Sequence, residues 1–385
     1  MAVKKKVGIV IGPHANKWVE TYNDTVGMSP KRPWLDAVPR SRRVDEDGRF
    51  KPTGRFVRID IAMAYALMYI NEKRGQPYAL DIIPAGKVSS KLFEGYDFIF
   101  YHWFDLLIVP SYKPFADKAG RPMAKLKKIY DKHAPKIFPP AKYADLIYDK
   151  CDYYSFLSER GLPVGNTVCV NRHEFEAAPK ATASRIARHI KLAKWGEAFA
   201  KPVWGTDAID VGRPAQLNTQ PKILKYLTQT FANQRYPKVV FQKFYSDFET
   251  TVPQIRTYWL GDRYQYSVME DHTEHYLTEA NDVPLIEKAK AIARETFKYI
   301  KPLFRKDGRK VDPFVTRVDF GCCLEKGNKD TLFINEIEFN PGLYLYMDPV
   351  DSYRRMNFDF KMATQADRII RQFFGFKQPR GKIKI

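Results

Sequence analysis

The sequence contains few cysteines. Its 385 residues include four, Cys151, Cys169, Cys322 and Cys323, and no two of them form a CxxC pair. Adjacent cysteines cannot easily bridge each other, because a disulfide requires a particular separation of the two Cα atoms. We therefore expect neither a disulfide framework nor a zinc knuckle, and a reducing compartment, the cytoplasm, fits this sequence best.

The sequence also lacks a long apolar run. Its most apolar stretch, residues 96–110, is interrupted by Asp97, His102 and Asp105, and it falls short of the roughly 20 residues that cross a bilayer. Near the start, residues 7–11 form only a short apolar run, and no small-residue cleavage site follows it. We expect neither a membrane span nor a secretion signal.

Acidic residues are scarce relative to basic ones, with 44 Asp and Glu against 64 Lys and Arg and a net charge of +20. Such a charge concentrates anions around the protein, including nucleotides, acidic peptides, polyphosphates and nucleic acid. No RNA- or DNA-binding motif accompanies it, so nucleic acid is not an expected partner. Hydrophobic residues make up 44% of the chain, which is ordinary for a folded globular protein.

The alternation of strand-like and helix-like segments predicts an α/β fold. A chain of 385 residues is long enough for two or three packed units with a cleft between them. A proline-rich link at residues 134–140 marks one boundary. We expect a small α/β domain at residues 1–140, followed by domains at residues 141–236 and 237–385.

Apolar spacing locates the individual elements. The first domain is predicted to contain strands at 5–11, 79–83 and 96–104, a helix at 57–73 and a long loop at 21–53. The later domains are predicted to contain helices at 148–160, 181–194 and 285–300, strands at 166–170, 198–203 and 238–244, and two further strand pairs on either side of the last helix.

Two segments near the C-terminus carry the most distinctive chemistry, Thr316–Gly321 and Leu332–Gly342. Strand alternation places Phe333, Ile337 and Phe339 on one side of the second segment. The other side is predicted to carry Leu332, Ile334, Glu336, Glu338 and Asn340, joined by Asp319 from the neighbouring strand. Like charges repel at such spacing unless a cation is present, and oxygen ligands of this kind suit Mg²⁺. The alternative is an exposed acidic strand face paired with surface lysines.

Two lysines upstream favour the metal and phosphate interpretation. Lys201 lies at the end of an apolar strand, before Pro202 and a turn, and Lys150 opens a predicted helix. A lysine at a strand end beside a turn is placed to pair with a phosphate as a point charge. Each lysine alone is weak evidence, so their order along the chain matters more than either position.

This order of motifs, from about residue 150 to residue 342, resembles that of the ATP-grasp superfamily. The resemblance implies that Lys150 and Lys201 bind nucleotide phosphates and that the main chain of the strand at 239–244, at Gln242, Lys243 and Phe244, reads the adenine edge. Carboxylates at Asp247 or Glu249 would bind the ribose hydroxyls. The family usually has an acidic residue where Lys243 stands.

The same resemblance assigns roles around the strand pair. Arg256, before a Leu-Gly-Asp turn, and Arg317 are the implied catalytic residues, which balance charge on the transferring phosphoryl group. The implied metal ligands are Asp319, Glu338 and Asn340, with Glu336 as an extra carboxylate that replaces or supplements Glu338. One departure is the phosphate-covering loop, which is normally rich in glycine but here offers only Gly205, with Ala208 at a second glycine position.

The resemblance implies an ATP-grasp fold, in which a Rossmann-like N-terminal domain precedes two α+β subdomains that clasp ATP. It also implies an ADP-forming ligase that uses Mg²⁺, with two ions, to activate a carboxylate as an acyl phosphate for attack by an amine. The basic charge favours an acidic peptide or a small dicarboxylate as the substrate. A homodimer is the default expectation for the assembly.

Three alternatives remain open on the sequence. The first is an ATP-grasp kinase acting on a small polyanion, which the net charge of +20 suits. The second is a nucleotide-binding module without catalysis, and the third is a nucleic-acid-binding protein, whose affinity would fall steeply with salt. His272 and His275 permit a metal site or proton shuttle, but a polar loop between strands is the simpler interpretation.

Overall fold

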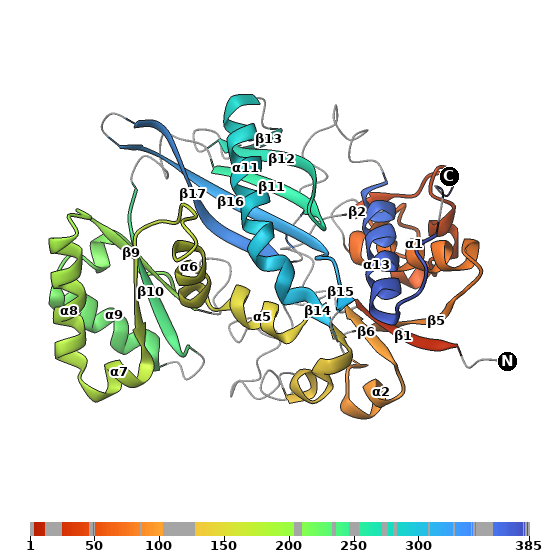
Figure 1. The fold of residues 1–385 in the computed structure, drawn as a ribbon, viewed down its shortest axis with the longest axis horizontal. Helices are drawn as coiled ribbons and strands as arrows, with labels where there is room; N and C mark the ends of the chain where they lie inside the picture. Colours follow the sequence, from red (N-terminus) through yellow and green to blue (C-terminus); the bar gives the residue numbers. More distant parts are fainter. Residues whose placement is uncertain are drawn as a thin grey trace.

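The computed structural model describes most of the chain. The described residues are 4–11, 25–45, 49, 51–84, 87–102, 128–203, 210–232, 236–245, 254–271, 276–279, 283–306, 309–325, 328–339, 341, 343, 357–379, 381 and 383. Figure 1 shows a parallel sheet at one end of the molecule, a three-stranded sheet at the other and a five-stranded sheet between them. Among the described residues, no helix combines the length and apolar character that a membrane crossing requires.

The N-terminal sheet is parallel. Its strand order is β5 (Tyr78–Pro84), β1 (Lys5–Ile11), β6 (Phe98–Tyr101) and β7 (Ile137–Phe138). From Val7 to Ile11, strand β1 is apolar and buried, as expected for a strand with a neighbour on each side. Helix α1 (Ile59–Lys73) packs beside this sheet. The predicted strands at 5–11 and 79–83 and the helix at 57–73 are confirmed to within two residues.

The predicted long loop at 21–53 is wrong for its described part. It contains β2 (Thr25–Gly27) and β3 (Arg43–Val44), which pair with β4 (Phe56–Arg58) in a small antiparallel sheet. The 3-10 helices η1 (Pro33–Ala37) and η2 (Arg40–Arg42) lie between them. Trp34, Leu35 and Val44 are buried. Burial of these apolar side chains offsets the conformational entropy that is lost when a polar segment becomes ordered.

The three-stranded sheet is antiparallel, with the order β8 (Thr167–Asn171), β10 (Lys238–Lys243) and β9 (Ala198–Pro202). One face packs on α7 (Arg172–Ala177), α8 (Pro179–Leu192) and α9 (Gln220–Ala232), and its core contains Val239 and Phe241. Alternation turns Val240 to the opposite face, where its neighbour Cys169 contacts α6 (Lys150–Ser158). The predicted strands and helices of this region are confirmed to within two residues.

The five-stranded sheet is also antiparallel. Its order is β13 (Tyr276–Glu279), β12 (Arg263–Asp271), β11 (Gln254–Leu260), β16 (Val315–Glu325) and β17 (Asn328–Phe339). Helix α11 (Val283–Ile300) covers one face, where Phe297 contacts Trp259 of β11. The two predicted strand pairs are thus confirmed as parts of one sheet, to which β13 adds a strand.

Short elements connect these layers. They are α2 (Ser90–Glu94), η4 (Ala134–Lys136), α5 (Ala141–Tyr148), η5 (Pro214–Gln216), η6 (Lys301–Phe304), β14 (Arg305–Lys306) and β15 (Arg309–Lys310). Helices α5 and α6 run between the parallel sheet and the three-stranded sheet (Figure 1). They bring the segment after the proline-rich link to the centre of the molecule.

The last helix, α13 (Phe358–Phe374), returns to the N-terminal part and packs along α1. Trp34 of η1 donates a hydrogen bond to Asp359 at 2.7 Å, and its ring contacts Phe360. Phe373 contacts Phe98 of β6 with ring centroids 4.3 Å apart. The two ends of the chain therefore share one apolar core. The predicted domain limits stay a prediction.

The cysteine expectation is wrong in one respect, because Cys151 of α6 and Cys169 of β8 form a disulfide with their Cα atoms 6.0 Å apart. The absence of CxxC pairs did not reveal this disulfide. The two cysteines lie 18 residues apart and are brought together because α6 packs on the sheet. Cys322 and Cys323 are buried and take no part in this disulfide. The few cysteines therefore no longer argue for a reducing compartment, and the cytoplasmic location stays a prediction.

Asp367 of α13 is a fully buried carboxylate at the junction with the N-terminal part. It accepts hydrogen bonds from the Tyr78 hydroxyl at 2.7 Å and from Arg371 Nε at 2.9 Å, and it also pairs with Arg74. Burial, and then the negative charge of Asp367, raise the pKa of Tyr78 well above its usual value. Tyr78 therefore stays protonated and donates to the carboxylate.

We expect Asp367→Asn to lower the free energy of unfolding by about 3–5 kcal/mol, because it leaves buried arginines without their counter-charge. Urea denaturation followed by tryptophan fluorescence measures this change. Glu72→Gln on the exposed side of α1 is the control, with an expected effect within about 0.5 kcal/mol. Equal stability of both variants would show that Asp367 does not hold α13 in place.

Candidate functional site

The candidate site begins with an irregularity in the pairing of β16 and β17. Asp319 pairs with Glu336, but the next residue, Phe320, pairs with Ile334, so Asn335 is an extra residue in β17. Such a β-bulge changes which side chains share a face on its two sides. Gly321, on the same face as Asp319, pairs with Phe333. Phe333 therefore shares the face of Glu336 and Glu338.

The predicted alternation along β17 is consequently wrong beyond the bulge. Leu332 and Ile334 pair with Cys322 and Phe320 and lie on the face opposite the carboxylates. Strict alternation holds only in a regular strand, and nothing in the local sequence marks the extra residue. The carbonyl of Asn335 accepts hydrogen bonds from the hydroxyls of Tyr153 and Tyr154 of α6, which fix the bulge.

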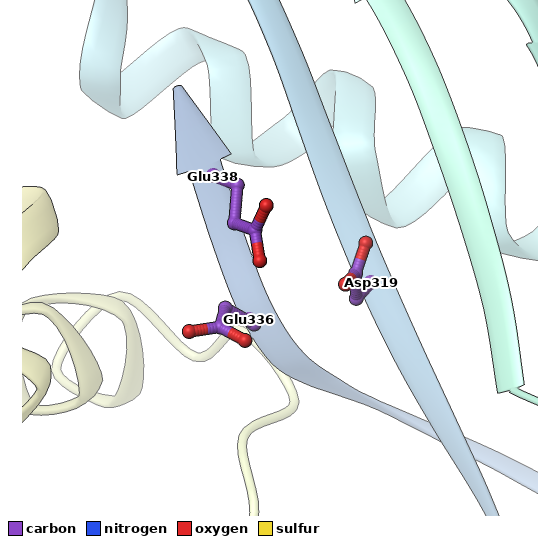
Figure 2. A group of neighbouring side chains, drawn as sticks. All are labelled: Asp319, Glu336 and Glu338. Atoms are coloured by element: carbon purple, nitrogen blue, oxygen red, sulfur yellow. The ribbon is translucent and has the colours of Figure 1, made fainter. Parts of the chain in front are cut away.

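Three carboxylates meet on this face. Asp319 extends from β16 and Glu336 and Glu338 from β17, as Figure 2 shows. Each offers an oxygen that lies within 4.8 Å of an oxygen of the other two. Asp319 is buried, with 1% of its surface exposed, and the two glutamates are partly buried. This grouping of the three residues was expected from the sequence, and the proposed metal-binding role follows from their oxygen chemistry.

Arg317 lies among these carboxylates. Its guanidinium donates two hydrogen bonds of 2.7 Å to the two oxygens of Asp319 and contacts Glu338 at 2.8 Å. Burial lowers the pKa of Arg317, but Asp319 and Glu338 outweigh burial and raise it well above its usual value. The guanidinium is a permanent positive charge with a planar geometry that fits a carboxylate.

Lys150 approaches the cluster from α6. Its ammonium lies 2.9 Å from Glu336, and only 8% of the residue is exposed. Burial would raise the pKa of Glu336, but the charges of Lys150 and Lys201 outweigh it and hold that pKa below its usual value. Glu336 is therefore ionised at neutral pH. Lys201, from β9 in the other sheet, is close enough for its positive charge to act on Glu336 as well.

The three carboxylates thus face Arg317, Lys150 and Lys201 across a short distance. From the sequence we expected a cation beside these carboxylates and left open a pairing with lysines. The protein supplies three cations of its own. A divalent cation together with a polyphosphate fits this balance, because the cation offsets part of the negative charge of the polyphosphate.

The start of α6 is fixed by several contacts. Asp149 caps the helix by accepting hydrogen bonds from the backbone of Cys151 and Asp152. Lys238 of β10 pairs with Asp149 at 2.8 Å and with Asp152 at 2.6 Å. The disulfide joins α6 to β8 one residue after Lys150. A lysine in the first helical turn opposes the helix dipole unless anions lie nearby, so this position favours an anion-binding role.

Arg256 lies on β11 directly beside Asp319 of β16. It therefore shares the face of Arg317 and the carboxylates. Its guanidinium donates a hydrogen bond of 3.0 Å to Gln254. The five-stranded sheet thus carries two arginines and three carboxylates on the face opposite α11.

Gln242, Lys243 and Phe244 lie at the end of β10 and just after it, on the three-stranded sheet. The backbone N–H of Lys243 donates to the carbonyl of Asn166 at 2.9 Å, and that of Phe244 donates to the carbonyl of Glu197 at 3.0 Å. These two donors are therefore already used within the protein.

Some predicted residues cannot be placed. Asp247, Glu249 and Asn340 lie outside the described residues, as do His272, His275 and the loop with Gly205 and Ala208. Their predicted roles stay predictions. Lys150, Arg256, Arg317, Asp319, Glu336 and Glu338 are brought together, with Lys201 facing them from the second sheet.

Sequence reasoning did not identify Phe333 as part of this face. Its ring packs over Gly321, where an added Cβ would lie 2.3 Å from the ring, and it contacts Tyr245 with centroids 5.0 Å apart. Tyr245 follows β10, so this aromatic pair joins the two sheets beside the charged groups. The pairing of Gly321 with Phe333 could have been predicted only if the position of the bulge had been known.

Comparison with known proteins gives matches by structure. No protein-family model matches the sequence, and no curated protein matches it. A D-cycloserine synthetase, DcsG, aligns with a TM-score of 0.54 and 13% identity, over 94% of this chain and 99% of that chain. D-alanyl-alanine synthetase A from Vibrio cholerae O1 biovar eltor aligns with a TM-score of 0.52 and 10% identity, over 95% and 99% of the two chains.

A D-alanine–D-alanine ligase from Bacillus anthracis, solved in complex with ATP, aligns with a TM-score of 0.50 and 11% identity, over 96% of this chain and 97% of that chain. The three alignments span nearly the whole of both partners. The chain therefore has the ATP-grasp fold, as the motif order predicted. At identities of 10–13% the likeness concerns the fold.

We expect Gly321→Ala to destabilise the protein by about 1–3 kcal/mol, because the added methyl group overlaps the Phe333 ring. The measurement is urea denaturation of Gly321→Ala, Phe333→Leu and the double variant. In the double variant the loss should be smaller than the sum of the two single losses, because the obstructing ring is gone. Strictly additive losses would mean that the two residues do not interact.

Proposed function

We propose that this protein is an ATP-dependent ligase that activates a carboxylate as an acyl phosphate and joins it to an amine. The observation that carries the proposal is the meeting of three carboxylates with Arg317, Lys150 and Lys201 between two sheets. Positive and negative groups set side by side in this way suit a metal-bound polyphosphate. The ATP-grasp fold supports the proposal by analogy, as does the ATP complex of one structural neighbour.

The proposed phosphate-binding groups are Lys150 and Lys201, which approach from α6 and β9. Lys150 is nearly buried, so its charge is weakly screened by water. On nucleotide binding it would exchange part of its contact with Glu336 for a phosphate oxygen. The positive end of the α6 dipole acts in the same direction.

The donor set fits Mg²⁺, because three carboxylates offer hard oxygen atoms within reach of one ion and none of the ligands is a sulfur or a histidine. Asp319, Glu338 and Glu336 would hold the metal, two ions by analogy, with Asn340 as a further ligand predicted from the sequence. Bound Mg²⁺ would polarise the phosphate oxygens and offset charge on the transferring group. Arg317 keeps Asp319 and Glu338 oriented toward the same space.

In the proposed reaction, a substrate carboxylate oxygen forms a bond to the γ-phosphorus of ATP while the bond to the bridging oxygen breaks and ADP leaves. Arg317 and Arg256 stabilise the negative charge that spreads over the transferring group. An amine then forms a bond to the acyl carbon as the acyl–oxygen bond breaks, and the proton that the amine loses is taken up by the inorganic phosphate that leaves. The chain's own groups act by positioning and electrostatics, so no nucleophilic side chain is required.

We propose a small-molecule or peptide carboxylate as the substrate. The net charge of +20 favours an acidic one, such as a small dicarboxylate or a glutamate-rich peptide. The structural neighbours named as D-alanine ligases make D-alanine a second substrate to test. A homodimer stays the default expectation.

The test is release of ADP and inorganic phosphate from Mg-ATP, measured across a pooled panel of amino acids, D-alanine, dicarboxylates and acidic peptides. We expect phosphate release that requires both a carboxylate and an amine. ADP formed without free phosphate would instead indicate a kinase. Failure of the protein to bind Mg-ATP in a direct titration would overturn the proposed function altogether.

Glu338→Gln should abolish turnover while ATP binding changes by less than about tenfold, because the amide removes a metal ligand but leaves the lysines in place. Glu287→Gln, on the exposed face of α11, is the matched control and should retain full activity. Turnover and nucleotide affinity are measured on the same preparations. Unchanged turnover in Glu338→Gln would refute the assignment of Glu338 to the metal.

A further inference from the structure

A pocket with a volume of about 490 Å³ lies in the N-terminal part of the chain, where η1, α1 and the edge strand β5 meet. Volumes of about 300–1,000 Å³ are usual for small-molecule sites. Helix α1 and strand β5 lie at the end of the molecule opposite α8 (Figure 1). Among the described residues that line the pocket, none belongs to α6 or to the two sheets of the candidate site. The pocket is therefore separate from that site.

The charged part of the lining is acidic. Asp36 of η1 and Glu72 of α1 are the charged residues of the described lining, and both are exposed carboxylates. The protein as a whole carries a net charge of +20, so the pocket is a local exception to a basic surface. Long-range charge repels cations from such a protein, and a cation that binds must be held by nearby groups. The two carboxylates supply that local attraction.

Aromatic side chains form much of the remaining lining, which includes Trp34, Tyr65, Met68, Tyr69 and Tyr78. The rings of Trp34 and Tyr69 lie 6.1 Å apart and are tilted by 53°, so they do not stack on each other. Ring faces attract cations, and aromatic cages bind organic ammonium groups in this way. Tyr69 already makes such a contact, because the ammonium of Lys73 lies 5.3 Å from the centre of its ring.

Asn71 of α1 adds a hydrogen-bond acceptor. Only 6% of the residue is exposed, and its amide nitrogen donates to the carbonyl of Tyr78 at 2.9 Å. Because a carbonyl can only accept, this bond fixes the orientation of the amide. The amide oxygen, Oδ1, meets no hydrogen-bond partner among the described residues. Buried acceptors in folded proteins are usually paired, and Asn71 lines the pocket, so we expect a ligand to bring the donor.

We propose that this pocket binds a small organic cation, namely a primary amine or a guanidine on an apolar chain. The N–H groups of the cation would donate to Oδ1 of Asn71 and to the carboxylates of Asp36 and Glu72. The apolar chain would pack on Tyr65 and Met68. Because the described lining shares no residue with the candidate site, this binding goes beyond the proposed ligase activity and does not depend on it.

The test is a ligand-detected NMR titration of the full-length protein with hexamethylenediamine and with hexanediol. The two molecules have the same apolar chain, and only the diamine is charged. We expect the diamine to bind at least about tenfold more tightly than the diol, because ion pairs and a cation–π contact add to its affinity. Failure of the diamine to bind, or equal affinity for the two molecules, would overturn the inference.

A double variant, Asp36→Asn with Glu72→Gln, locates the bound amine. It removes both charges of the lining and should weaken diamine binding by at least about fivefold. Glu287→Gln, on the exposed face of α11, makes the same kind of change outside the pocket and should leave the affinity unchanged. Circular dichroism checks that the variants are folded, and Mg-ATP binding should be equal in all of them.

The outcomes separate this pocket from the proposed ligase site, which also takes an amine. A folded double variant that binds the diamine as tightly as the unmodified protein would place the amine elsewhere and overturn the inference. If the double variant does not fold, Glu72→Gln alone decides, with an expected loss of affinity of about threefold. Failure of the unmodified protein to bind Mg-ATP would overturn the proposed function and leave the binding of the diamine in this pocket in place.

Discussion

The buried guanidinium of Arg317 is the interaction on which the candidate site depends. It holds both oxygens of Asp319 and one oxygen of Glu338, so two carboxylates that would repel each other are kept side by side and aimed in one direction. Lys150 does the same for Glu336 from another element. The face is thus strongly polar but close to neutral, and this balance is the basis of the proposed binding of a metal ion together with a polyphosphate.

The geometry around Arg317 needs support from distant parts of the chain. Tyr153 and Tyr154 of α6 hold the bulge at Asn335, and the same helix presents Lys150 to Glu336. The disulfide between Cys151 and Cys169 then fixes that helix to the three-stranded sheet, which carries Lys201. The two sheets are therefore related to each other through α6, and the relative position of the two lysines depends on that helix.

The fold is shared with proteins that have only 10–13% of their residues in common with this chain. This is physically reasonable, because layered sheets and helices require apolar residues at the right spacing and tolerate many combinations of them. Close contacts between individual atoms are less tolerant. The Phe333 ring fits over residue 321 only because that residue is glycine, so this pair is a property of this chain rather than of its fold.

The sequence by itself determined most of the longer strands and helices and the membership of the charged group. The spacing of apolar residues that marks a strand or a helix lies within the segment itself, so β1, α11, β16 and β17 could be predicted. The order of Lys150, Lys201, Asp319 and Glu338 along the chain indicated the fold. Only the tertiary structure decided how these groups neutralise one another, which face Phe333 takes, that Cys151 meets Cys169, and that the last helix joins the first. Each of these depends on contacts between residues far apart in the chain or on one extra residue in a strand, and local periodicity carries no information about either.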